Sequence, residues 1–406
     1  MDVDPERLRE LRHDRGWDVS EMARRARDVT RQQRTPLPDL EILKGYVRRH
    51  ENGRVRVSEK YALLYAKALG VEIPELSRRA VLTTAAAVPL AFAPDPDLFE
   101  RVTRAAAAPS RADDATITYF GQSIAGLLRA EDTVGGIPLW NTARAQLADV
   151  AALARGSDGA QATRLVSLAA QYARLLGWMR EAVADYAAAL AWYDRAHDWA
   201  VEAGDTNMMV TAISMKAQLA SKSGNPQRCI RLGNAALGYQ NRVTSATAAL
   251  AAAYTAYGCA ELKDTEVVNR LLDDSDRLAA AAANRMEDEP DYLYWVPVSA
   301  PGARGIAEMI TGSDEALASL TVAIRTLPAS FTCDRTEYSA RLARAHAQLG
   351  NAERAEDVAV RTAEPSANVP RARAELVTAA GILDEADATP QARTVRDALA
   401  AYPVRT

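Results

Sequence analysis

The sequence of 406 residues predicts an all-α protein on three observations. From about residue 97 onward, segments with helical periodicity, each about 14 to 18 residues long, alternate with short breaks at Gly, Asn, Asp or Pro. Runs of alternating apolar and polar residues between turn dipeptides, which would predict strands, are absent. Hydrophobic residues make up 48% of the chain but aromatic residues only 6%, so the core is mostly Ala, Leu and Val, which suit close helix packing.

Length and charge divide the chain into parts. We expect a domain at residues 1–76 (the head), a connecting helix and linker at 77–96, and a helical domain at 97–406 (the body). Residues 1–80 carry 18 Lys and Arg against 14 Asp and Glu, whereas the whole chain has a net charge of −4. A basic head on an acidic body favours a partner of phosphate character at the head.

Four segments of the head carry helix signals, at residues 7–16, 20–27, 40–53 and 58–71. In the third segment, Leu43, Val47 and His50 recur at i, i+4 and i+7, which predicts one buried face. The opposite face then carries three cations and a gap in the side-chain surface, at Lys44, Gly45, Arg48 and Arg49.

Residues 28–39, between the second and third helices, are expected to form an inserted loop. Pro36 and Pro38 exclude a helix at their own positions and disfavour one just before them. The segment also carries Arg31 and Arg34, so it can lie along a phosphate backbone.

Glu51 requires a compensating group, because a carboxylate near a helix C-terminus opposes the helix dipole. The first helix offers Arg12 as a partner for it. Asn52-Gly53 directly after Glu51 is a helix stop signal, since glycine tolerates the left-handed conformation that ends many helices.

Four pieces in this order resemble the XRE family, the helix-turn-helix DNA-binding domain of phage repressors. They are Arg12-x3-Gly16, Glu21-Met22-Ala23, Glu51-Asn52-Gly53 and Ala68-Leu69-Gly70-Val71. The resemblance covers roughly the first 75 residues. The loop at 28–39 is longer than the family's usual connection, and an insertion of this kind is found in an actinobacterial branch.

The resemblance implies roles for individual residues. The residues matching Arg12 and Glu51 form a buried salt bridge in that family. Aligned from Glu51-Asn52-Gly53, the base-reading positions of the third helix fall on Lys44, Gly45 and Arg49, with Arg48 beside them. The positions that contact phosphates in that family fall on Asn52, Arg54 and Arg56. A solvated basic face without a partner remains the alternative for these cations.

The helical segments of the body fall into pairs separated by short turns. The turns are expected at Gly204-Asp205, Gly224-Asn225, Lys263-Asp264, Gly312-Ser313 and Gly350-Asn351. The expected pairs are 161–178 with 180–203, 207–224 with 226–239, 245–262 with 265–283, 303–312 with 315–327, and 335–350 with 353–363. Residues 97–160 are expected to form a helical cap.

The turn Ala347-Gln348-Leu349-Gly350-Asn351, followed by Ala355, makes the body resemble a tetratricopeptide-repeat array. The units here are longer than the 34 residues usual for that family. One helix pair cannot bury its own apolar face, so neighbouring pairs stack, and the resemblance implies an elongated concave surface lined by the first helices.

Candidate ligand residues are chosen from those first helices and from one aromatic loop. They are Asn207, Lys216, Tyr254, Tyr257, Tyr292, Tyr294 and Trp295. Other aromatic residues at helical steps, including Tyr172, Trp178 and Tyr193, are more often part of a core.

Signatures of catalysis are absent. The sequence has no Walker A motif, no GxGxxG after a strand, no HExxH and no GxSxG. Its four histidines and three cysteines show no metal-ligand spacing, so we expect no metal, no cofactor and no enzymatic activity.

The compartment is predicted to be cytoplasmic. The cysteines are odd in number and far apart, which is typical of reduced thiols. Arg78-Arg79 before an apolar run is similar to a twin-arginine export signal, but that run is about 14 residues, too short to span a bilayer. We interpret it as a connecting helix that ends at Pro89.

The sequence therefore predicts a DNA-binding transcriptional regulator. The head would read a roughly palindromic operator as part of a homodimer, and the body would sense a peptide, small-molecule or protein effector. The alternative is a protein-interaction scaffold whose head no longer binds DNA. Acidic residues within the first helix, Glu6, Glu10 and Asp14, are compatible with that alternative.

Overall fold

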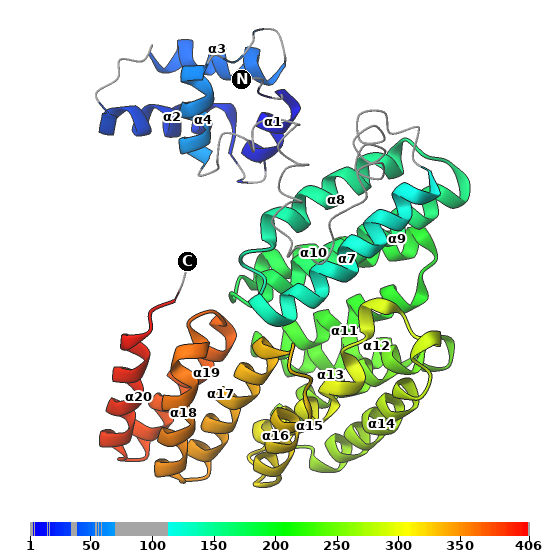
Figure 1. Cartoon of the computed structure of the whole chain (residues 1–406), viewed down its shortest axis with the longest axis vertical. Coiled ribbons are helices and arrows are strands. Elements are labelled where there is room, and N and C mark those ends of the chain that lie inside the picture. Colours follow the sequence, from blue (N-terminus) through cyan, green and yellow to red (C-terminus); the bar gives the residue numbers. More distant parts are fainter. Residues whose placement is uncertain are drawn as a thin grey trace. The chain divides into compact units, whose positions relative to one another are not determined.

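The computed structural model describes residues 3, 5–13, 15, 17–33, 39–52, 55, 57, 59–69 and 113–404, and these form helices and turns without strands (Figure 1). The predicted all-α class is confirmed for this part of the chain. Contacts between residues divide the chain into Met1–Pro94, which contains the head, and Asp95–Thr406, which contains the body. No helix among the described residues has the length and apolar character needed to cross a membrane.

The described helices of the head are α1 (Pro5–His13), α2 (Val19–Gln33), α3 (Leu40–Glu51) and α4 (Glu59–Leu69). α2 packs against α3 and α4, and α1 packs against α3. The predicted inward faces are confirmed: Leu43 and Val47 of α3 are fully buried, in one cluster with Met22, Ala23 and Tyr65. Burial of these side chains is what holds four short helices together.

The first half of the segment 28–39, expected as a loop, is helical. Residues 28–33 belong to α2, so the helix continues six residues past the predicted end. Neither of the prolines lies within this stretch, and Arg31 and the two glutamines after it are good helix formers, so the chain stays helical to Gln33. Residues 34–38, which include Arg34, lie outside the described residues, as do residues 70–112 with Arg78 and Arg79.

The body begins with α7 (Asp114–Val134) and α8 (Trp140–Arg155), and helix pairs follow (Figure 1). The pairs are α9 (Gly159–Glu181) with α10 (Tyr186–Ala203), α11 (Thr206–Lys222) with α12 (Pro226–Leu237), α13 (Ser245–Glu261) with α14 (Thr265–Ala283), α15 (Val296–Thr311) with α16 (Glu315–Thr326), α17 (Thr332–Gln348) with α18 (Ala352–Ser366), and α19 (Pro370–Glu385) with α20 (Thr389–Ala401). Short 3-10 helices occupy Gln240–Arg242, Met286–Asp288 and Asp291–Leu293.

All five predicted turns have one common geometry. The first residue of each turn is left-handed, for example Gly204 at φ 68° and Gly350 at φ 75°. The second residue donates its amide to the carbonyl five residues earlier, as Asp205 does to Ala200 at 2.9 Å. This is the hydrogen bond of the Schellman motif, which satisfies carbonyls left free at a helix end. The side chain of Asp205 then caps the next helix through the Met208 amide at 2.9 Å.

Two further turns of this type, at Ala184-Asp185 and Asp387-Ala388, were not predicted. Ala184 at φ 60° and Asp387 at φ 59° hold the left-handed position there. The first of these turns places the end of α9 at Glu181, three residues beyond the predicted one. α15 also begins at Val296 and not at Ala303, because buried Val296 and Ser299 extend it although Pro301 removes one helical hydrogen bond.

The helix pairs stack through their first members: α9 contacts α11, α11 contacts α13, α13 contacts α15, and α17 contacts α19. α7 contacts both α9 and α17, which joins an early helix of the body to a late one. The Thr332 hydroxyl donates to the Thr133 carbonyl at 2.7 Å across this junction. The first helices therefore surround a common interior space.

Candidate functional site

The first candidate site is the outward face of α3. Asp39 caps the helix by accepting a hydrogen bond from the Ile42 amide at 2.9 Å, so the helix begins at a defined residue. Leu43, Val47, His50 and Glu51 are its buried residues. The remaining face is fixed as the solvent side by this burial.

Arg12 and Glu51 anchor the C-terminal end of α3. Arg12 Nε lies 2.7 Å from Glu51 Oε1, and its Nη2 lies 2.9 Å from Glu51 Oε2. The exposed fractions of the two side chains are 7% and 4%. A bidentate contact of this kind orients both groups, and losing one partner would leave a buried charge uncompensated.

Two cations on the α3 face have neighbours and one does not. Lys44 Nζ lies 2.7 Å from Glu41 Oε1, and the guanidinium of exposed Arg49 lies 4.8 Å from the Tyr46 ring centre. Among the described residues, exposed Arg48 makes no ion pair. Because exposed pairs contribute less than about 1 kcal/mol, a phosphate can displace Glu41 from Lys44 at small cost.

Other predicted contact residues differ in how they are placed. Asn52 is exposed, and its side-chain oxygen accepts a hydrogen bond from Arg9 at 2.8 Å. Gly45 leaves room on the face, with only the end of Arg49 within 4 Å of an added Cβ. Arg34, Arg54 and Arg56 lie outside the described residues, and Arg31 lies on α2 with its side chain outside them.

An aromatic cluster supports the buried side of α3. His50 Nδ1 lies 2.8 Å from the Tyr65 hydroxyl, and the His50 ring lies 5.2 Å from the ring of Tyr61. Burial and the neighbouring charge of Arg49 lower the pKa of His50. The imidazole is therefore neutral at physiological pH, and the buried side of α3 carries no positive charge from His50.

The second candidate site is a cavity of about 90 Å³ inside the body. Its lining comes mainly from α7, α9, α11, α13, α15 and α17, the first helices of the pairs together with α7, and from the residues just before α15. A space of this size holds several water molecules or a small organic group. It is the place where the first helices converge.

Four of the seven predicted ligand residues line this cavity: Tyr254, Tyr257, Tyr294 and Trp295. The other three do not. Asn207 Oδ1 accepts hydrogen bonds from the Thr244 amide and the Thr247 hydroxyl, and Lys216 pairs with Asp194 at 3.1 Å. Tyr292 is buried beside the cavity, with the Arg174 guanidinium 5.8 Å from its ring centre.

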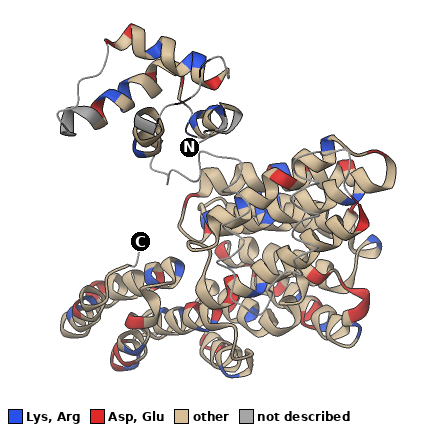
Figure 2. Cartoon of the chain, turned by 45° about the horizontal axis from the view of Figure 1, so that its top comes forward, with Lys and Arg blue, Asp and Glu red and all other residues tan. Residues whose placement is uncertain are grey.

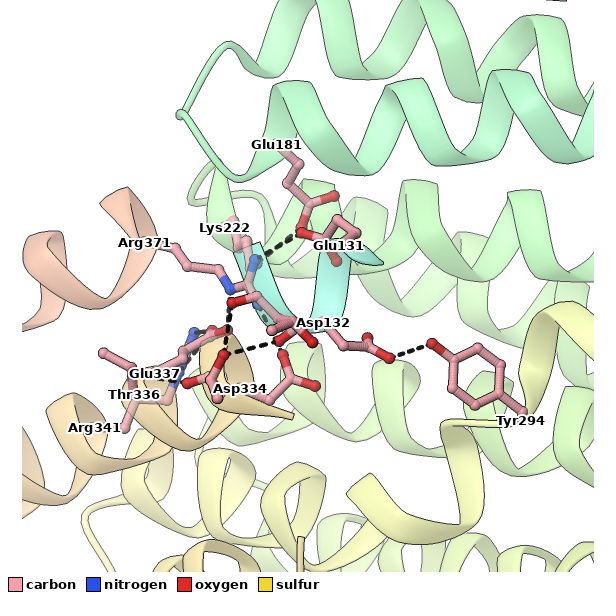
Figure 3. Close-up of polar contacts among 12 residues, drawn as sticks. Glu131, Asp132, Glu181, Lys222, Tyr294, Asp334, Thr336, Glu337, Arg341 and Arg371 are labelled. Atoms are coloured by element: carbon pink, nitrogen blue, oxygen red, sulfur yellow. Dashed lines mark hydrogen bonds and ion pairs between the residues drawn. The ribbon is translucent and has the colours of Figure 1, made fainter. Parts of the chain in front are cut away.

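One wall of the cavity is acidic, and the sequence did not predict it (Figure 3). Glu131 and Asp132 of α7 lie on it together with Asp334 and Glu337 of α17. The two acidic pairs lie on helices that are far apart in the sequence. Only the contact between α7 and α17 brings them together. The acids three residues apart in α17 were the available sequence signal.

Arg371 of α19 compensates most of this wall (Figure 3). Its Nη2 lies 2.8 Å from Asp334 Oδ1, its Nη1 lies 3.5 Å from Glu131 Oε1, and its Nε donates to Glu337. Arg341 adds a second guanidinium 2.8 Å from Glu337. This network links α17 and α19 through charge-assisted hydrogen bonds and joins α7 to them through the ion pair of Glu131.

The pKa values of the wall follow from burial and from these partners. Although burial alone would raise it, the guanidinium groups of Arg371 and Arg341 lower the pKa of Glu337 to about 2. Burial raises the pKa of Asp334 to about 6 in spite of Arg371. Asp132, whose carboxyl meets the Tyr294 hydroxyl, has its pKa raised by burial to about 8, so it is protonated at neutral pH.

The opposite charge on the cavity lining belongs to Arg174 of α9. It is 3% exposed, and its Nε and Nη2 have no hydrogen-bond partner. Sequence reasoning missed this residue, although a single arginine in the apolar stretch from Leu168 to Met179 was a signal. A charge within a buried helix face requires a partner, and the sequence alone could not say whether one was present.

No protein-family model matches the chain, and no curated protein matches it. The two sites are therefore interpreted from their own geometry.

Proposed function

We propose that the protein is a sequence-specific DNA-binding transcriptional regulator. The head would bind the major groove through α3, and the body would sense an effector and form the homodimer. The observation that carries the proposal is the α3 face, where exposed Arg48 and Arg49 lie opposite a fully buried side. A short, capped helix that presents arginines outward is the element that major-groove recognition requires.

Several features support this function further. The Arg12–Glu51 pair fixes the end of α3 relative to α1, and a fixed helix positions its side chains for base edges at low entropic cost. The stacked helix pairs, with a cavity among their first members, support the proposal of a tetratricopeptide-type array with a sensing role for the body. Binding of an effector there would act by a population shift between two arrangements of the dimer.

The test begins with genome-wide mapping of bound DNA, which supplies a duplex for gel-shift titration. Arg49→Ala is expected to relax the preference at one base pair, a loss of about 1–3 kcal/mol of discrimination. Lys44→Ala together with Arg49→Ala should weaken binding further. Lys67→Ala, an exposed cation on α4, is the matched control and should leave binding unchanged. Unaltered affinity and preference in the double variant would refute the assignment of α3.

A scaffold whose head does not bind DNA is the second candidate. It is favoured by the acids that offset cations on the head, since Glu21 pairs with both Arg24 and Arg25 and Glu41 pairs with Lys44. The salt dependence of duplex binding separates the two functions. Phosphate contacts give a steep fall in affinity with salt concentration, whereas a scaffold would show none.

A further inference from the structure

Arg174 is a buried cation without an anionic partner. Its side chain is enclosed by the body at 3% exposure, and among the described residues no carboxylate forms an ion pair with it. The neutral ring of Tyr292 lies 5.8 Å from its guanidinium carbon. Burying an unpaired guanidinium costs roughly several kcal/mol, because the group loses its hydration and gains no anionic partner.

This guanidinium faces a space that a ligand can occupy. Arg174 lines the cavity of about 90 Å³, and so does Gln218, whose side-chain oxygen also lacks a hydrogen-bond donor. Apolar and aromatic groups supply the rest of the surface near them, including Leu250, Tyr254 and Trp295. The planar fork of an arginine matches the two oxygens of a carboxylate.

The charges on the other wall disfavour a ligand with more than one negative charge. Glu131, Asp334 and Glu337 already share Arg371, and Glu337 also has Arg341. Asp132 carries its proton at neutral pH and adds no charge. Arg371 and Arg341 balance two of these three carboxylates, so this wall keeps an excess of negative charge. Arg174 is available to one carboxylate, whereas a dianion such as phosphate would place a second negative charge next to this acidic wall.

We propose that the cavity binds a small organic monocarboxylate, with its carboxylate on Arg174, its apolar or aromatic body against Leu250, Tyr254 and Trp295, and a hydrogen-bond donor toward Gln218. This inference deepens the sensing role proposed for the body by naming the chemical class of its effector. Arg174 then serves to bind the ligand, and its burial lowers the stability of the ligand-free protein.

The experiment uses the full chain without DNA, in a buffer of low chloride concentration. Phenylacetate is the probe, with phenylethanol as its neutral counterpart and inorganic phosphate as the dianion. Calorimetric titration and thermal unfolding are measured for the wild type, Arg174→Met and Arg164→Met. Arg164 lies on the same helix, exposed and paired with Asp114 at 2.6 Å, so it is the matched control.

Phenylacetate is expected to bind and to raise the unfolding temperature of the wild type and of Arg164→Met. Arg174→Met should bind it at least about tenfold more weakly, the loss expected for removing a charge-assisted fork. Without ligand, Arg174→Met should unfold at a higher temperature than the wild type, a change that loss of a purely structural arginine would not produce. Phenylethanol and phosphate should not compete with phenylacetate.

Several outcomes would overturn the proposal. These are equal binding of phenylacetate and phenylethanol, preference for phosphate, or no binding of phenylacetate at about 20 mM, where even millimolar affinity would be seen. If Arg174→Met does not fold, Arg174→Lys keeps the charge without the fork and should still weaken phenylacetate binding. Because DNA is absent, a failure of DNA binding by the head would leave this result standing, and the reverse also holds.

Discussion

Two arginines at the cavity have different surroundings: Arg174 is buried and lines the cavity, whereas Arg371, whose side chain is 8% exposed, contacts the acids of the opposite wall. Arg371 lies among three carboxylates, from α7 and α17, whereas Arg174 on the other wall has none. Burial alone therefore does not describe what a charged side chain contributes. The partnered arginine holds three helices together, and the unpartnered one weakens the empty protein but is available to an incoming anion.

The largest expected effect breaks the partnered wall. Arg371→Met should lower the free energy of unfolding by about 3–5 kcal/mol, because Asp334, Glu337 and Glu131 lose a shared cation while remaining buried. Chemical denaturation of the variant measures this. Arg361→Met on α18 removes an exposed arginine whose partner is Asp357, and it should change stability by less than about 1 kcal/mol.

Together with Arg174→Met, this substitution tests the comparison directly. The same chemical change at two buried arginines should shift stability in opposite directions. Loss of stability of similar size in both variants would show that Arg174 has a structural partner after all.

An intermediate effect is expected at Asp132, the carboxyl of the acidic wall that meets Tyr294 and makes no ion pair among the described residues. Its pKa is raised to about 8 by burial, so the folded protein keeps a proton that the unfolded chain releases above about pH 4. The stability that this proton contributes is fully present below about pH 4, falls as the pH increases, and is lost once the pH has risen through 8.

Asp132→Asn removes this dependence. Relative to the wild type, the variant should gain stability as pH rises from about 5.5 to 8, by up to about 1.4 kcal/mol per pH unit. Unfolding curves of both proteins across that range provide the measurement. A difference that stays constant with pH would contradict a buried, protonated Asp132.

The smallest expected effect comes from residues away from both walls, where a substitution changes only the strain of the local backbone. Exposed Ala184 holds a left-handed backbone conformation at φ 60°, so Ala184→Gly should stabilise the body by about 1 kcal/mol. Gly204→Ala is the reverse change at φ 68°, with open space around the added Cβ, and should destabilise by a similar amount. Thermal unfolding that shows shifts of the same sign would refute this backbone explanation.

Sequence reasoning succeeded where the cause is local. The turns from Gly204-Asp205 to Gly350-Asn351 were predictable because the left-handed residue and the hydrogen bond that closes the helix end act within one turn of a helix. The buried face of α3 followed from the spacing of Leu43, Val47 and His50 for the same reason. The turn at Ala184 was missed because alanine gives no signal for that conformation.

The candidate sites depended on distant contacts and were predictable only in part. Tyr254, Tyr257, Tyr294 and Trp295 were chosen by their position on first helices and in one loop, and they do line the cavity. The uncompensated state of Arg174 could not be predicted. It depends on how the acids of α7 and α17 are shared with Arg371, which involves residues more than 200 positions apart along the chain. Basic and acidic residues are intermixed on the helices of the body (Figure 2), so charge pattern alone gave no guide.

The junction at which Thr332 meets Thr133 has a consequence for how the protein folds. These residues are separated by 199 positions, so α7 leaves the ribosome long before its partner α17 exists. Contacts of such long sequence separation form slowly, and the surfaces that await them are exposed in the meantime. The cavity can therefore be completed only late in synthesis. The nascent body is expected to need chaperone protection until α17 and α19 have docked.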